Sequence, residues 1–259
     1  MPHPLDFDDQ PGSCRPIRIA TWNLHNCRAG FDRVARQLRA LDADVVGLQE
    51  VDRGTRRSGG VDQAAELART CGYRHFQFFR AIARDRGEYG VALLSRFPLS
   101  GQRVGMLPNR PRFEQRVVAT AVVEFPPVWL AVSVTHLTNS RSDSRLRREQ
   151  ARWIAAHHRD CPLPQVLLGD LNEPPFGPMW HELTPLFSDV FAAVGQGDGG
   201  TFPVALPFLP ALRFDYVFAS RDLGLAAARV VRTRASDHHP LVAELWLPPP
   251  APTRFALFG

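Results

Sequence analysis

The 259-residue sequence contains no lysine, so arginine supplies all 31 of its Lys and Arg positions. Against 26 acidic residues, this leaves a formal net charge of +5. The planar fork of donors on arginine suits phosphate groups. The sequence is also rich in alanine, proline and glycine, and this composition favours a GC-rich coding bias as the reason for the missing lysine. The charge is therefore only a weak indication of an anionic substrate.

Cysteine is scarce, and long apolar runs are absent. The four cysteines, Cys14, Cys27, Cys71 and Cys161, are too widely spaced for a zinc knuckle or a C-x-x-C pair, so we expect free thiols in a reducing compartment. No apolar run is long enough to span a bilayer. Residues 1–15 lack the basic head and apolar core of a signal peptide. We expect a soluble cytoplasmic protein that is monomeric and has no obligate protein partner.

Hydrophobic residues make up 44% of the chain, which is enough to bury a large core, and no break in composition divides it. We therefore expect one domain over residues 16–248. A flexible N-terminal tail (1–15) and a C-terminal tail (249–259) would flank it.

The stretch from Val166 to Asn172 (VLLGDLN) has the composition of a buried strand. Because side chains alternate along a strand, Val166, Leu168, Asp170 and Asn172 share one face. Two polar groups thus follow two apolar groups on a core-facing surface. A carboxylate in that place is costly unless it binds something.

Four other predicted strand regions have the same arrangement, with polar residues at the ends of apolar rows. They are Ile17–Leu24, ending near Asn23; Asp44–Glu50, with Glu50 in the row of Val46 and Leu48; Val128–Leu137, ending near His136; and Arg213–Ser220, which begins near Asp215. A loop that carries Asp237 and His238 precedes a last strand, Leu241–Leu247. If Arg213–Ser220 runs antiparallel to its neighbours, all these polar groups lie at one rim.

The remaining elements form a scaffold for this rim. Apolar residues at helical spacing predict amphipathic helices over Phe31–Leu41, over a segment from the N-cap Asp62 to Cys71, and over Arg141–Arg159. Further strands are predicted over Tyr73–Phe79, Tyr89–Ser95 and Gln115–Phe125, with Pro126–Pro127 as a turn.

The polar residues at the rim supply mainly carboxylate and amide oxygens. Such oxygens bind hard cations, whereas zinc prefers more nitrogen or sulfur. We therefore expect Mg²⁺, with Mn²⁺ as the alternative, and chemistry on a phosphoester.

Six short motifs resemble those of the endonuclease/exonuclease/phosphatase superfamily. In chain order they are Thr21-Trp22-Asn23, Leu48-Gln49-Glu50, Thr135-His136-Leu137, Gly169-Asp170-Leu171-Asn172, Phe214-Asp215-Tyr216 and Ser236-Asp237-His238-His239-Pro240. The resemblance covers about residues 17 to 247. It implies the DNase I-like fold: a four-layer α/β sandwich with two mixed, mostly antiparallel β-sheets packed face to face and helices outside.

The resemblance also implies a role for each matched residue. Glu50 would be the main metal ligand, helped by Asn23 and, directly or through water, by Asp237. Asp170 would position or deprotonate the attacking water, and Asn172 would bind a phosphate oxygen. His238 would stabilise charge on the phosphate, with Asp215 orienting its ring. His136 lies where the DNase and sphingomyelinase branches place a histidine, a candidate general acid that abasic-site endonucleases do not typically carry.

These observations predict a Mg²⁺-dependent phosphoesterase that cleaves diesters by in-line attack of water. A DNA or RNA endonuclease is the first alternative. A sphingomyelinase, or a phosphatase acting on phospholipids or inositol phosphates, is another. A non-catalytic binding module that kept the fold is the alternative from a different class of protein.

Several residues have two interpretations. Glu88 could support His136, but we favour an exposed loop glutamate. Arginines at positions 141, 145, 147 and 148 could bind phosphate, but we favour a solvated helix face. The run Val204–Leu212 could touch lipid, but we favour a loop packed on the sheet edge. Surface or packing roles are expected for His25, His75, His157, His158 and His181, and we expect His239 to point away from the site.

Overall fold

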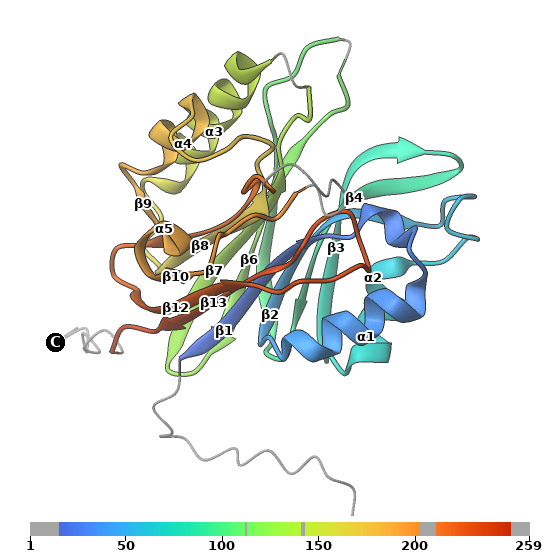
Figure 1. Cartoon of the computed structure of the whole chain (residues 1–259), viewed down its shortest axis with the longest axis horizontal. Coiled ribbons are helices and arrows are strands. Elements are labelled where there is room, and N and C mark those ends of the chain that lie inside the picture. The colour runs from blue at the N-terminus through green and yellow to red at the C-terminus, as the bar shows by residue number, and fades with distance from the viewer. Residues whose placement is uncertain (1–15, 112, 141–142, 203–210, 250–259) are drawn as a thin grey trace, which may run out of the picture.

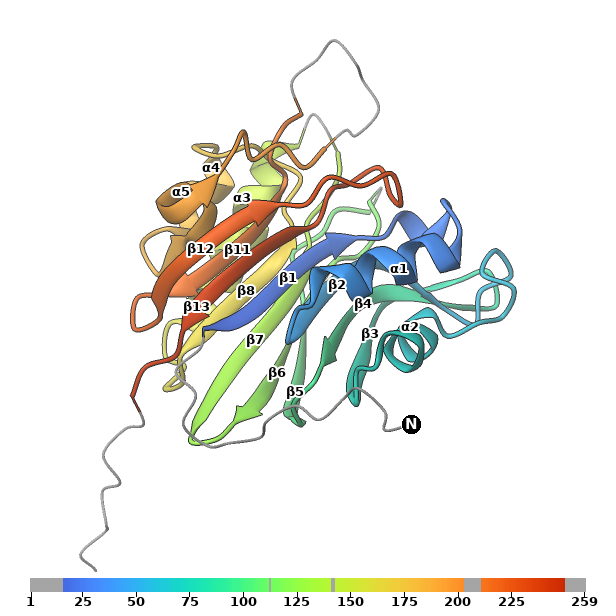
Figure 2. The ribbon, with the colours of Figure 1, turned by 60° about the horizontal axis from the view of Figure 1, so that its bottom comes forward.

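The computed structural model describes residues 16–111, 113–140, 143–202 and 211–249, which form four layers (Figures 1 and 2). Two β-sheets pack face to face, with α1 and α2 on one outer side and α3 and α4 on the other. Both sheets are mixed and mostly antiparallel. The predicted sandwich is therefore confirmed.

The first sheet has seven strands. In spatial order these are β10 (Gly195–Gln196), β12 (Gly224–Val230), β13 (Leu241–Trp246), β1 (Ile17–Asn23), β2 (Val45–Arg53), β4 (Gly87–Ser95) and β3 (His75–Arg84). The second sheet has six strands: β5 (Leu99–Met106), β6 (Val117–Phe125), β7 (Val128–His136), β8 (Gln165–Asp170), β11 (Asp215–Ser220) and β9 (Phe187–Asp189).

Helices complete the outer layers. They are α1 (Phe31–Leu41), α2 (Gln63–Cys71), α3 (Ser144–His158) and the short α4 (Pro178–Leu183). The short α5 (Val190–Val194) packs instead against the central core, and a 3-10 turn η1 (His25–Cys27) follows β1. Asp62 caps α2 as predicted, because its side chain accepts a hydrogen bond from the backbone N–H of Ala65. None of these helices is both long and apolar enough to cross a bilayer.

Alternating side chains divide the hydrophobic core into three parts. Val166 and Leu168 of β8 lie in the central core between the sheets, whereas Leu167 lies under α3 and α4. On the other sheet, Ile19 faces the central core and Trp22 lies under α1 and α2. The predicted alternation of β8 is therefore confirmed.

The sequence prediction missed several elements. It missed β5, β9, β10, β12, α4 and α5, and it ended β3 too early. Strand β12 is rich in alanine, which has a low strand propensity, and β5 is an exposed edge strand with two glycines. Helix α4 begins with Pro178, and proline fits the first turn of a helix because no hydrogen bond is lost there.

Strand pairing brings the polar strand ends together at one edge of the sandwich. Strands β7 and β8 are parallel, with His136 opposite Asp170, and β11 is antiparallel to β8, with Asp215 opposite Asp170. On the other sheet, β1 and β2 are parallel, so Asn23 and the end of β2 are neighbours. The shared rim predicted from the sequence is present.

Cys27, Cys71 and Cys161 are free thiols, as predicted. Cys14 and most of the run Val204–Leu212 lie outside the described residues.

Candidate active site

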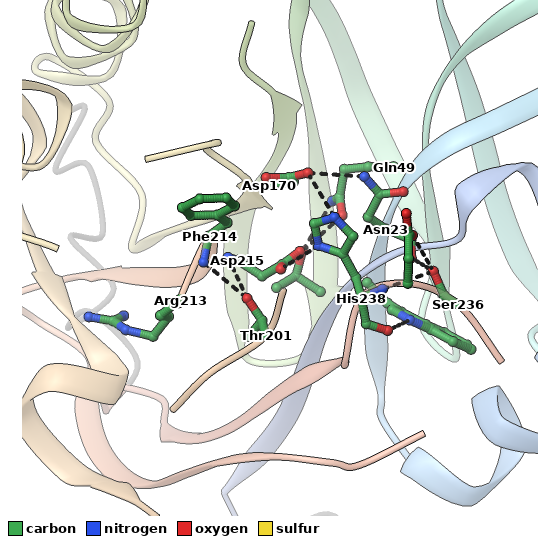
Figure 3. A network of polar contacts seen from close by, with 12 residues as sticks. Asn23, Gln49, Asp170, Thr201, Arg213, Phe214, Asp215, Ser236 and His238 are labelled. Atoms are coloured by element: carbon green, nitrogen blue, oxygen red, sulfur yellow. Dashed lines mark hydrogen bonds and ion pairs between the residues drawn. The ribbon is translucent and has the colours of Figure 1, made fainter. Parts of the chain in front are cut away.

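His238 lies between two carboxylates at the rim (Figure 3). Its Nδ1 is 2.8 Å from Asp215 Oδ2, and its Nε2 is 3.7 Å from Asp170 Oδ2. All three side chains are buried. Burial alone would lower the pKa of His238, but Asp215 and Asp170 outweigh burial and raise it to about 10. His238 is therefore an imidazolium at neutral pH.

Backbone contacts hold His238 in this position. Trp22 Nε1 donates to the carbonyl oxygen of His238 at 3.0 Å, and Ser236 Oγ accepts from its N–H at 3.2 Å. Ser236 in turn donates to the carbonyl oxygen of Asn23. The ring of Phe202 lies against the imidazole, with centroids 4.5 Å apart. The loop before β13 is thereby fixed to β1.

Asp170 accepts two hydrogen bonds, from Asn23 Nδ2 and from the backbone N–H of Asn172, each at 3.0 Å. It is 1% exposed. Burial raises the pKa of Asp170 to about 7, with Asp215 adding to the rise and His238 opposing it. A carboxylate with a pKa near 7 can take a proton from water at neutral pH and later release it.

Glu50 reaches the rim by a β-bulge. Regular alternation would place it in the row of Val46 and Leu48, and these residues pack under α1 and α2. The register between β2 and β4 shifts after Leu48, and Glu50 has a φ of 55°. Its carboxylate thus turns toward Asn23, whose Nδ2 donates to Glu50 Oε1 at 3.3 Å. The predicted row was wrong, although the residue lies at the rim.

Asp237 lies beside η1, where its Oδ2 is 3.1 Å from His25 Nδ1. His25, Asn26 and Cys27 all have positive φ values. The turn is held by Asn26, which donates to the carbonyl oxygen of Glu50. His25, expected to be a surface or packing residue, is partly exposed and is also a neighbour of the predicted metal ligand Asp237.

Asn172 follows β8 with a φ of 52°, and its Nδ2 donates to the carbonyl oxygen of Leu137 at 3.1 Å. It therefore joins the ends of β7 and β8. Its side-chain oxygen makes no hydrogen bond among those found for the described residues.

His136 faces Asp170 from β7, with Nε2 3.4 Å from Asp170 Oδ2. Its other ring nitrogen, Nδ1, is 3.0 Å from Nη1 of the buried Arg116. Burial, together with Arg116 and His238, holds the pKa of His136 well below its usual range. His136 is therefore neutral at physiological pH.

Glu88 neither supports His136 nor lies in a loop. It belongs to β4, where it pairs with Arg53 and Arg80. The turn from β3 to β4 precedes it at Asp85 and Arg86, two residues with positive φ. Both interpretations of Glu88 were wrong.

The arginines of α3 differ in their surroundings. Arg145 is exposed and Arg148 pairs with Glu182, which agrees with the predicted solvated helix face. Arg147, in contrast, is only 5% exposed. Arg147 donates to the carbonyl oxygen of Ser140 at 2.6 Å, and its Nε is 3.5 Å from Glu173 Oε1. It therefore fixes the loop after β7, and the prediction of a solvated face was wrong for this residue.

The other histidines follow the prediction more closely. His157 is exposed and stacks on Trp153, and His158 is buried, with Nε2 2.8 Å from Ser133 Oγ. His239 Nδ1 accepts from the backbone N–H of Thr233.

The donors near Glu50 fit a hard divalent cation, because Glu50 and Asp237 offer carboxylate oxygens. Asn23 directs its NH₂ group at Glu50 and Asp170, while its Oδ1 accepts from the N–H of His25. It could offer Oδ1 to a cation only after its amide rotates. Asp170, Asp215 and His238 also converge within 4.8 Å, but His238 would have to lose a proton before a ring nitrogen could bind a metal.

Sequence reasoning assigned no role to several residues that shape the site. Gln49 is buried and bonds to Thr21, and Thr201 Oγ1 accepts from the N–H of Asp215. Arg116 stands just before β6, and a lone arginine at the start of an apolar strand was the one available signal.

A two-sheet sandwich with carboxylates and histidines at one rim is the architecture of the DNase I-like phosphoesterases. Residues 20–238 match the Endonuclease/Exonuclease/phosphatase family, and the chain belongs to this family. No curated protein matches the chain.

Several solved structures are similar. An endonuclease/exonuclease/phosphatase from Beutenbergia cavernae is 28% identical, with a TM-score of 0.76 over 91% of this chain and 72% of that chain. The mannosyl-6-phosphatase of Bacteroides thetaiotaomicron is 18% identical, with a TM-score of 0.71 over 88% of this chain and 99% of that chain. The human Nocturnin catalytic domain, with a bound sulfate, is 19% identical, with a TM-score of 0.70 over 89% and 93% of the two chains. The last two similarities concern the fold alone.

Proposed function

We propose that the protein is a divalent-metal-dependent phosphodiesterase, with Mg²⁺ as the cation and Mn²⁺ as the alternative. The observation that carries this proposal is the placement of His238 between Asp170 and Asp215, beside Glu50 and Asn23. This arrangement combines a carboxylate that can accept a proton with a fixed positive charge.

Asp170 is the proposed base. The water oxygen attacks phosphorus, its proton passes to Asp170, and the bond from phosphorus to the leaving oxygen breaks. The leaving oxygen departs as an anion, which takes its proton from solvent. The pKa of Asp170, raised to about 7, supports this role. Its hydrogen bonds to Asn23 and Asn172 fix the direction of the carboxylate.

His238 is the proposed stabiliser of negative charge on the phosphoryl oxygens, and Asp215 keeps it charged and oriented. Asn172 is proposed to donate to a phosphate oxygen. It would release Leu137 to do so. Glu50 and Asp237, with Asn23 after rotation of its amide, would hold the cation. When bound, the cation withdraws charge from a phosphoryl oxygen and lowers the pKa of water.

Diesters are the preferred substrate class because the resemblance at His136 is to branches that cleave diesters. The mannosyl-6-phosphatase of similar fold makes a monoester the necessary comparison. A nucleic acid is the second candidate, since the arm formed by β3, β4, the end of β2 and the loop after it carries several partly exposed arginines: Arg53, Arg56, Arg57, Arg80 and Arg84.

The test is hydrolysis of bis-p-nitrophenyl phosphate and p-nitrophenyl phosphate by the purified full chain with Mg²⁺ or Mn²⁺. Plasmid DNA, RNA, sphingomyelin, glycerophospholipids and inositol phosphates complete the substrate panel. Asp170→Asn and His238→Ala should each abolish turnover, and His181→Ala, an exposed histidine on α4, should not change it. Near-normal rates in either site variant would refute the assigned roles. Absence of hydrolysis with every substrate would favour a non-catalytic binding module.

A further inference from the structure

A buried arginine lies behind His136, on the side opposite to Asp170. Arg116 is 4% exposed, and its Nη1 lies 3.0 Å from His136 Nδ1. His136 Nε2 lies 3.4 Å from Asp170 Oδ2. The imidazole therefore joins a guanidinium to the proposed base.

The chemistry of the guanidinium decides where the imidazole proton lies. Arginine has five N–H donors and no acceptor, and it keeps its proton in proteins. Nδ1 of His136 must therefore accept the hydrogen bond with its lone pair. The single proton of the neutral ring is then on Nε2, which faces the site.

The position of Arg116 is fixed by further contacts. Glu114 Oε1 is 3.1 Å from Arg116 Nη1, and Glu114 Oε2 accepts from Arg84 Nη1 at 2.7 Å. The chain from Arg84 through Glu114 and Arg116 thus ends at His136, and Nδ1 faces a guanidinium in place of a carboxylate that would favour an imidazolium.

We propose that Arg116 is a positioning residue that fixes His136 as the neutral Nε2–H tautomer, so that His136 donates a hydrogen bond to a phosphoryl oxygen and does not protonate the leaving group. This role rests on the proposed phosphodiesterase function. It replaces the general-acid role that the resemblance implies for His136.

The tautomer can be measured without any assay of activity. We would record ring ¹⁵N signals of the ¹⁵N-histidine-labelled full chain and assign His136 by comparison with His136→Gln. A protonated Nε2 and an unprotonated Nδ1 at neutral pH are expected. A protonated Nδ1, or an imidazolium, would overturn the inference.

A second experiment separates a hydrogen-bond donor from a general acid. Hydrolysis of bis-p-nitrophenyl phosphate releases p-nitrophenolate, a stable anion that needs no acid, whereas hydrolysis of a dinucleotide releases an alkoxide whose departure an acid would assist. For His136→Ala we expect kcat to fall by about 10²-fold with both kinds of substrate, as for loss of one oxyanion donor. A loss at least tenfold larger with the alkoxide leaving group would show that His136 is the acid.

Variants of Arg116 complete the test. In Arg116→Gln, the glutamine amide can either donate a hydrogen bond to Nδ1 or accept one from it, so His136 should populate both tautomers. The kcat should fall about tenfold or more, with little change in KM. Arg116→Lys keeps a donor and the charge, and it should restore the Nε2–H tautomer and most of kcat. Equal kcat values and tautomers in Arg116→Gln and the native protein would contradict the proposal. If no phosphodiester is hydrolysed at all, the proposed function fails, while the ¹⁵N measurement still decides the tautomer.

Discussion

Asp170 should weaken the fold, although it is central to the proposed reaction. Burial raises its pKa from 3.8 to about 7, which corresponds to about 4 kcal/mol against the ionised form. Because the folded-state pKa lies above the unfolded value, the stability linked to Asp170 is fully present below pH 4. It is lost as the pH rises through 7. Asp170→Asn should therefore unfold at a higher urea concentration than the native protein at pH 8.

The measurement is the free energy of unfolding from urea titrations at pH 4.5 and pH 8, with EDTA present so that cations do not contribute. At pH 8 we expect a gain of up to about 4 kcal/mol for Asp170→Asn, shrinking toward zero at pH 4.5. The matched control is Asp215→Asn, which removes the carboxylate 2.8 Å from His238 Nδ1. That variant leaves the buried imidazolium without the nearer of its two carboxylates and should lose about 3–5 kcal/mol.

The two neighbouring carboxylates are thus expected to have opposite effects on stability. If Asp170→Asn were less stable than the native protein at pH 8, or if its gain were the same at both pH values, the argument from burial would be refuted.

Three further substitutions test the packing around the site. Arg147→Met leaves the buried Glu173 without its charged partner and should cost about 3–5 kcal/mol in urea titrations. Gly47→Ala places a Cβ 2.9 Å from Leu168 Cδ1, and this overpacking should cost about 1–3 kcal/mol. Burial lowers the pKa of His158, so its unfolded form takes up a proton first and stability falls as the pH drops below about 6.5. His158→Gln should show a smaller loss between pH 7.5 and pH 5.

Much of the site could be predicted because strand alternation and pairing are regular. Once β8 is read as a strand, Asp170 must share the face of Val166 and Leu168. The parallel and antiparallel partners of β8 then bring His136 and Asp215 to either side of it. These three positions follow from local pattern and sheet geometry alone.

Glu50 could not be placed in this way. Its bulge puts a non-glycine residue at a φ of 55°, and no glycine, asparagine or aspartate at that position signals the change. The resemblance to the family identified Glu50 as a site residue, but the alternation assigned it to the helix-covered face. Only the tertiary structure shows how the carboxylate reaches Asn23.

Arg116 and Arg147 show a second limit of the sequence. Arginine is usually exposed, so composition favours surface roles for both. Their burial depends on partners 20 or more residues away, namely His136 for Arg116 and Glu173 for Arg147. A buried arginine is recognised only when the fold shows which acceptors surround it.

The charges at the rim lead to a last prediction. Glu50, Asp215 and Asp237 supply three carboxylates at the rim, Asp170 supplies a fourth when it is ionised, and His238 lies among them as an imidazolium. A divalent cation would offset this excess, so Mg²⁺ should stabilise the folded protein. At 100 times its dissociation constant the gain is about 2.7 kcal/mol, measurable as a rise in Tm over an EDTA-treated sample.

The same measurement on a variant identifies the ligand. Glu50→Ala should abolish the Mg²⁺-dependent rise in Tm and the heat of Mg²⁺ binding, while His181→Ala should keep both. Because stabilisation by a bound ligand requires binding to the folded state, an undiminished rise in Glu50→Ala would place the cation elsewhere at the rim. The proposed roles of Asp237 and Asn23 as ligands would then fail together with that of Glu50, since all three assignments depend on a cation beside its carboxylate.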